Sequence, residues 1–161
     1  MSMEESLRKE LAEYLGNERT HADFFKAMRD LPETLINKKP RGLPYTFWGL
    51  LEHIRIAQHD MVEFMQTADY PKLDWPKDYW PSPKTKATKA MWKQSLASME
   101  KDLDALKQMI RDPAVDLFAP LPWGHGQTIF REAVQIIDHA SHHLGQLILM
   151  RRLEGNWKKK R

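Results

Sequence analysis

The chain has 161 residues, of which 42% are hydrophobic and 29% charged, and these values indicate one globular domain with a single hydrophobic core. The absence of cysteine excludes disulfides, thiolate metal sites, iron–sulfur clusters and a cysteine nucleophile. The net charge is +3, but Lys158 to Arg161 alone carry +4, so the rest of the chain is close to neutral.

Neither a charged leader with an apolar stretch nor a run of about 18 apolar residues occurs, so we expect a cytoplasmic protein without a membrane span. We assign residues 1–156 to one helical-bundle domain and residues 157–161 to a basic C-terminal tail. A few terminal lysines are more typical of a solvated chain end than of a nucleic-acid site, so we do not expect nucleic-acid binding.

The first predicted element is one long helix from about Ser2 to Met28, in which apolar residues recur at helical spacing. Gly16 and Asn17 weaken its interior and could kink it. The second predicted helix begins after Thr46, whose hydroxyl can accept a free backbone N–H, and ends near Thr67. His53 falls on or beside the apolar face of this helix, whereas His59 falls among polar residues.

A crossover segment over residues 69–83 contains four prolines, which exclude a helix. It also carries bulky aromatic side chains, namely Tyr70, Trp75, Tyr79 and Trp80. Ordered loops of this length are often lids or pocket walls, so the segment is a candidate lid. The equal alternative is that these rings only plug the end of a bundle.

Two further helices are predicted after the crossover. The third spans residues 84–111, and its expected buried residues are Met91, Leu96, Met99, Leu103, Leu106 and Ile110. The fourth begins near Thr128 and ends near Glu154, where Gly155 supplies a stop. Four long helical patterns without alternating strands predict an all-α fold, a four-helix bundle with a long crossover between helices 2 and 3.

Three of the seven histidines are placed to meet in space. His139 and His143 lie one turn apart on one side of the fourth predicted helix. That pair alone is also typical of surface or hydrogen-bonded core residues. His53 changes the balance, because a neutral imidazole on an apolar face needs a partner for each nitrogen and one shared metal ion would serve all three. His142 is rotated by about 100° from His143 and is excluded as a ligand.

The ligand set predicts a divalent metal ion with at least one open coordination position, as in catalytic zinc sites. Zinc, nickel, cobalt and iron(II) all accept imidazole nitrogen, and ligand type alone does not choose among them. Zinc and nickel are the first candidates.

The sequence resembles the DinB-like family of proposed metalloenzymes, the helical-bundle proteins rather than the unrelated DNA polymerase that shares the name. The resemblance is carried by LPYTFWGLLEHI at 43–54, PWGHGQT at 122–128 and, most specifically, DHASHHLGQ at 138–146. It implies a four-helix bundle with one metal-binding histidine from the second helix and two from the fourth, which are His53, His139 and His143 here. Members of the family include thiol S-transferases that use low-molecular-weight thiols and a thiol-dependent isomerase, and many have no known reaction.

Further residues are candidates for supporting roles. Asp138 and Gln146 could orient the ligand histidines or a bound water, although a solvated helix residue and a helix–helix hydrogen bond are the plain alternatives. The candidate pocket walls are Tyr45, Trp48, Trp80, Trp123 and His125, for which core and lid packing is the alternative.

The leading functional hypothesis is a metal-dependent transferase or hydrolase. In it the ion binds a low-molecular-weight thiol as thiolate, or water as hydroxide, and delivers it to a small-molecule electrophile. The alternative is a non-catalytic, stress-related metal-binding bundle, and we expect a homodimer. Nucleic-acid binding through the basic tail ranks below both.

Overall fold

The computed structural model describes residues 1–15 and 22–157, and the regular structure within them is helical. Apart from one isolated bridge between Pro120 and Thr128, these residues form no strand. The helices are α1 (Met3–Tyr14), α2 (Phe24–Arg29), α3 (Glu33–Ile36), α4 (Phe47–Gln66), α5 (Lys89–Arg111) and α6 (Ile129–Leu153), with a 3-10 turn η1 (Lys77–Tyr79). The predicted all-α fold is confirmed. None of the described helices has the length and apolarity needed to cross a bilayer.

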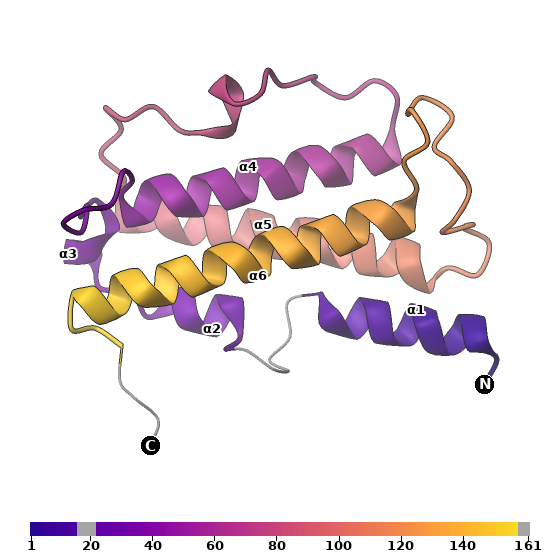
Figure 1. Cartoon of the computed structure of the whole chain (residues 1–161), viewed down its shortest axis with the longest axis horizontal. Coiled ribbons are helices and arrows are strands. Elements are labelled where there is room, and N and C mark those ends of the chain that lie inside the picture. The colour runs from indigo at the N-terminus through magenta and orange to yellow at the C-terminus, as the bar shows by residue number, and fades with distance from the viewer. Residues whose placement is uncertain (16–21, 158–161) are drawn as a thin grey trace.

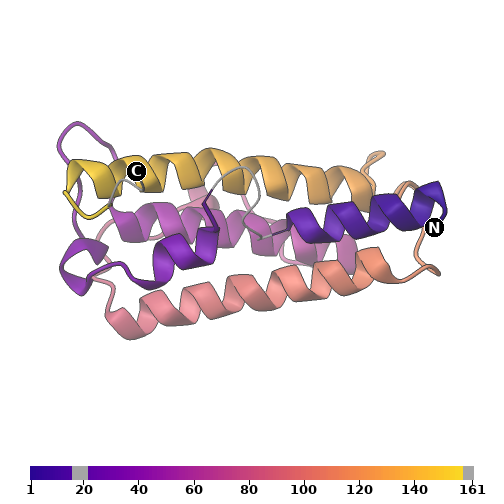
Figure 2. The same cartoon turned by 90° about the horizontal axis from the view of Figure 1, so that it is seen from below.

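The long helices lie side by side as a bundle. Figure 1 shows α4, α5 and α6 along the whole length of the molecule, and α4 packs against both α5 and α6. Figure 2 shows α1 and α2 one after the other in the remaining row, in front of the space between α5 and α6. The N-terminal half of α4 lies beside the middle and C-terminal part of α6 (Figure 1), so His53 of α4 meets His139 and His143 of α6.

Residues 67–88 return along the length of α4 before α5 begins (Figure 1). Because of this return, α4 and α5 run in the same direction. The η1 turn packs on α4 in the middle of the segment. The crossover thus forms a third element beside α4, in addition to α5 and α6.

The ends of α4 and α6 lie where the sequence predicted them. The Thr46 hydroxyl accepts the Gly49 N–H at 2.9 Å, and the Thr128 hydroxyl accepts the Arg131 N–H at 3.1 Å. Each hydroxyl satisfies one of the free N–H groups at a helix start. Gly155, with φ of +67°, follows the end of α6 in the left-handed conformation that glycine adopts without strain.

The prediction of one helix over residues 2–28 is wrong. Leu15 is extended and ends α1, and Asp23 begins α2 by accepting the Lys26 N–H at 2.6 Å. Asp23 favours a new helix start because its short carboxylate competes for backbone N–H groups. The predicted kink at Gly16 and Asn17 lies outside the described residues.

The predicted start of the third helix at residue 84 is also wrong. The Thr88 hydroxyl accepts the Met91 N–H at 3.2 Å, so α5 begins at Lys89. The predicted buried side of this helix is correct except for Met91, which is only partly buried, and it omitted Trp92, which is fully buried. The Trp92 indole donates to the Met28 carbonyl at 3.0 Å and so joins α5 to α2. The short helix α3 was not predicted.

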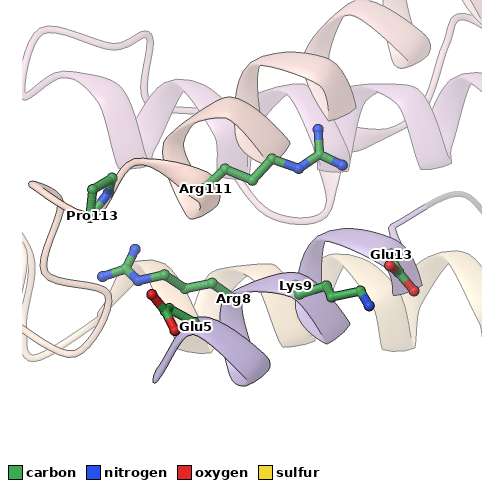
Figure 3. A pocket seen from close by; sticks show the side chains of 6 residues that line it. All are labelled: Glu5, Arg8, Lys9, Glu13, Arg111 and Pro113. Carbon is green, nitrogen blue, oxygen red and sulfur yellow. The ribbon is translucent and has the colours of Figure 1, made fainter. Parts of the chain in front are cut away.

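Arg8 joins α1 to the end of α5. Its guanidinium donates to the carbonyls of Ile110, Asp112 and Val115 at 2.9, 3.0 and 2.7 Å, and the residue is only 7% exposed. Figure 3 shows the side chain reaching from α1 toward the segment at Pro113. The last carbonyls of a helix lack partners within the helix, and a cation there also matches the helix dipole. Arg8 therefore completes the C-terminal end of α5.

We expect Arg8→Met to lower the free energy of unfolding by about 2–4 kcal/mol, because it leaves buried carbonyls without a donor. The measurement is urea unfolding followed by circular dichroism. Lys9→Met is the matched control, since Lys9 is exposed on the same helix. Equal unfolding midpoints for the two variants would contradict the assigned role of Arg8.

Candidate metal centre

Three histidines from two helices converge on one point, and we call them the histidine triad. His53 lies on the second turn of α4, and His139 and His143 lie on the middle of α6. The Nε2 atom of His139 is 3.2 Å from Nε2 of His53 and 3.2 Å from Nε2 of His143. One ligand atom from each residue lies within 4.8 Å of the others, so the triad could hold a metal ion.

The outer two histidines are fixed in the tautomer that a metal ligand needs. His53 donates from Nδ1 to the Tyr79 carbonyl at 2.9 Å, and His143 donates from Nδ1 to Gln146 Oε1 at 2.7 Å. A carbonyl oxygen only accepts, so the ring proton is on Nδ1 in both residues. The Nε2 atoms of both rings consequently carry lone pairs that face His139.

This arrangement fits a cation better than it fits the three rings alone. His139 Nε2 carries at most one proton, so it can satisfy only one of its two neighbours. The observed spacing of 3.2 Å is close to the roughly 3.3 Å expected between two nitrogens that lie about 2.0–2.1 Å from one tetrahedral ion. The donor set therefore matches a divalent metal that accepts imidazole nitrogen.

Burial keeps the triad neutral. The pKa of His139 is lowered to about 4, mainly by burial and further by the nearby His143, His53 and His142. Burial also lowers the pKa of His53 and of His143, although the hydrogen bonds to Tyr79 and Gln146 act in the opposite direction. Neutral imidazole is the form that binds a metal, so the site needs no deprotonation at neutral pH.

An aromatic ring covers one side of His53. The Trp80 ring stacks on the imidazole with centroids 4.1 Å apart and planes at 6°, and the Tyr45 ring stacks on Trp80 at 5.9 Å and 18°. Trp80 comes from the crossover and Tyr45 precedes α4. The crossover therefore borders the triad directly.

The comparison with known families agrees with this geometry. The model of the DinB superfamily matches residues 17–147, which include all three histidines.

The chain belongs to the DinB superfamily.

No curated protein and no solved structure matches the chain. The family match agrees with the resemblance found in the sequence motifs, and it covers the bundle from α2 to within α6, without α1.

The candidate pocket residues of this DinB-superfamily protein lie in three separate places. Tyr45 and Trp80 border the triad, as described above. Trp123 and His125 line a hollow of about 450 Å³ between the end of α4 and the start of α6, with Asp60, Phe64, Glu132 and Gln135 among its other walls. Trp48 lines a different hollow between α4 and α5, and its indole N–H has no hydrogen-bond partner among the described residues. The five residues therefore do not line one pocket.

Of the two residues predicted to orient the ligand histidines, only Gln146 contacts the triad. Gln146 contacts the triad through its hydrogen bond to His143, whereas Asp138 is exposed and makes no hydrogen bond or ion pair with the triad in the described part of the chain. His142 lies outside the triad, but its Nε2 accepts from Gln146 Nε2 at 3.1 Å. The two hydrogen bonds of the Gln146 amide, to His142 and to His143, set its orientation.

Sequence reasoning missed the roles of Tyr79, which contacts the triad, and of Asp60, which contacts Tyr79. The Tyr79 carbonyl has no sequence signal, because every residue carries one. The Tyr79 hydroxyl donates to Asp60 Oδ2 at 2.6 Å. The only available signal for Asp60 was its position seven residues after His53, which places both on one face of α4.

The metal-free protein should lose stability as the pH falls below about 6.5. The folded pKa of His139 is about 4 against 6.5 for an ordinary histidine, so between these values the unfolded chain binds protons that the folded chain does not. The loss is complete only near pH 4, and nothing is lost above 6.5 from this cause.

His139→Gln cannot take up this proton and should show a smaller loss over the same pH range. Urea unfolding of both metal-free proteins at about pH 7 and about pH 5 gives the comparison. Carboxylates with shifted pKa values are present in both proteins, so their contribution to the pH dependence of stability cancels in the comparison. An equal loss in the two proteins would show that His139 is not the group responsible.

Proposed function

We propose that this DinB-superfamily protein is a metal-dependent transferase or hydrolase that holds one divalent ion on His53, His139 and His143. The observation that supports the proposal is the convergence of imidazole lone pairs from α4 and α6, two of them fixed by hydrogen bonds to Tyr79 and Gln146. Zinc and nickel are the first candidates among the divalent ions that accept neutral nitrogen ligands, a group that also includes cobalt and iron(II).

A divalent ion in this position lowers the pKa of a thiol or of water and so supplies a nucleophile at neutral pH. The chain has no cysteine, so a thiol would have to come from a second, low-molecular-weight substrate. Trp80 excludes water from the face of His53 on which it stacks. The hollow of about 450 Å³ would accommodate the small-molecule electrophile, since its wall residue Gln135 precedes His139 by one turn of α6.

Glu132 is suited to exchange a proton with a substrate in that hollow. It lies in its wall and is only 5% exposed. Burial raises the pKa of its carboxyl, and the nearby Asp60 raises it further, while Arg131 acts in the opposite direction. A carboxyl with a raised pKa gives and takes protons closer to neutral pH than an exposed one.

Purified protein should contain about one divalent ion per chain. His139→Ala and His143→Ala should abolish metal binding with little loss of helicity, because each removes one of three ligands. Elemental analysis and circular dichroism provide the measurements. His125→Ala is the control, since His125 is an exposed histidine of a loop. Equal metal content in all four proteins would refute the proposed site.

Turnover should require the metal. A panel of electrophiles, tested with several low-molecular-weight thiols and with water alone, should give product only with metal-loaded protein. A chelator should abolish the activity, restored metal should return it, and His139→Ala should lack it. If the metal-loaded protein gave no product with any combination of electrophile and nucleophile, the proposed enzymatic function would be rejected in favour of the non-catalytic alternative.

That alternative is a non-catalytic, stress-related metal-binding bundle that forms a homodimer. Leu149 and Leu153 favour the homodimer, because they lie one turn apart on α6 and are 50% and 58% exposed. An apolar strip on a helix surface is typical of a contact between chains. A homodimer is compatible with either function, so the turnover assay decides between them.

A further inference from the structure

His53 differs from the other two triad histidines in what fixes it. Its ring is held on two sides by the crossover, through the 2.9 Å hydrogen bond to the Tyr79 carbonyl and through the stacked Trp80 ring at 4.1 Å. His143, by contrast, is fixed by Gln146 of its own helix. The tautomer and ring plane of His53 therefore depend on where a loop lies.

The position of that loop depends on Tyr79. Its carbonyl accepts from His53 and its hydroxyl donates to Asp60, so one residue contacts α4 at two points about two turns apart. Among the described residues, these are the two hydrogen bonds that join residues 69–83 to α4. The other hydrogen bonds of η1 stay within the loop, from Asp78 N–H to Asp74 and from Tyr79 N–H to Pro76.

The hydrogen bond between Tyr79 and Asp60 is short and partly buried, at 2.6 Å from hydroxyl to carboxylate. Hydrogen bonds to a carboxylate are roughly twice as strong as neutral ones. Rotation of the Tyr79 side chain away from Asp60 would leave the carbonyl contact to His53 as the only hydrogen bond holding η1 on α4. The other contacts of the crossover with α4, Trp80 on His53 and Tyr70 on Phe64, are ring packing, which does not direct the Tyr79 carbonyl as a hydrogen bond does.

We propose that Asp60 and Tyr79 are positioning residues of the metal centre: their hydrogen bond anchors the crossover on α4, and the anchored Tyr79 carbonyl keeps the His53 proton on Nδ1. The proposal rests on the proposed function, because it concerns the same histidines. With the proton on Nδ1, the Nε2 lone pair is available to a metal. With the proton on Nε2, His53 cannot bind the ion and the triad is left with two ligands.

The test compares the affinity for Zn²⁺ and Ni²⁺ of the whole protein and of variants, by competition with a chelating indicator. Tyr79→Phe removes only the hydroxyl, and Asp60→Ala removes its acceptor. Each should weaken binding about 10-fold, as is common when a group that orients a ligand histidine is lost. The double variant should also be about 10-fold weaker and not about 100-fold, because both changes break one interaction.

Tyr70→Phe is the matched control. Tyr70 lies in the same loop and packs on Phe64 with ring centroids 5.3 Å apart, and its hydroxyl has no hydrogen bond among the described residues. Loss of the Tyr70 hydroxyl should leave the metal affinity unchanged. Circular dichroism and thermal unfolding of every variant show whether the fold is intact.

A second measurement does not need the metal. Nitrogen-15 NMR of the imidazoles in metal-free protein should show His53 protonated on Nδ1, and Tyr79→Phe should give a mixture of the two tautomers. A merely structural role for the hydrogen bond would lower the melting temperature and leave the tautomer as it is.

The outcomes separate the two proposals. If the unchanged protein binds no divalent ion, the proposed function fails and the positioning role fails with it. If it binds the ion, but Tyr79→Phe retains full affinity and a single His53 tautomer, only the positioning role fails. Additive losses in the double variant would also overturn it, because Asp60 and Tyr79 would then act independently.

Discussion

The central constraint in this structure is that three neutral imidazoles are held with their lone pairs toward one another. In the absence of a cation this arrangement leaves at least one lone pair without a donor, a cost for partly buried groups. It persists because α4 and α6 pack against each other and because Tyr79 and Gln146 each hold a proton on the far side of a ring. Metal affinity and fold are therefore linked, since the ion would bind the folded chain and not the unfolded one.

Two buried arginines away from the triad stabilise the ends of the helices that form the bundle. Arg8 completes the end of α5, and Arg151 acts in a similar way near the end of α6. Arg151 is 3% exposed, bonds the Ala27 carbonyl and Asp30, and donates to the Asn156 side chain at 2.9 Å. These buried guanidinium groups satisfy backbone and side-chain oxygens where helices end. The helix that carries His139 and His143 is thus joined to α2 through groups that do not take part in the centre.

The crossover is less buried than the helices, and Trp75 within it is 71% exposed. Its contact with the centre depends on Tyr79 and Trp80, which lie side by side in the chain and touch His53 through a carbonyl and a ring. Both expectations for the crossover, a pocket wall and a plug of aromatic rings, therefore concern Tyr79 and Trp80.

The sequence by itself determined the helical class, the starts of α4 and α6, and the set of histidines that meet. Apolar spacing, a threonine cap and two histidines one turn apart are local features, and local physics fixes them. The starts of α2 and α5 were missed because single residues, Asp23 and Thr88, decided them against a continuing helical pattern.

Only the tertiary structure decided which groups orient the triad. A backbone carbonyl has no sequence signature, so the partner of His53 could not be predicted, and Asp60 becomes relevant only once Tyr79 lies over α4. The structure also decided between the alternatives for Asp138, which is exposed, and it placed Trp48 at a hollow between α4 and α5. Contacts between elements depend on how the chain returns on itself, and the pattern within one helix does not contain that information.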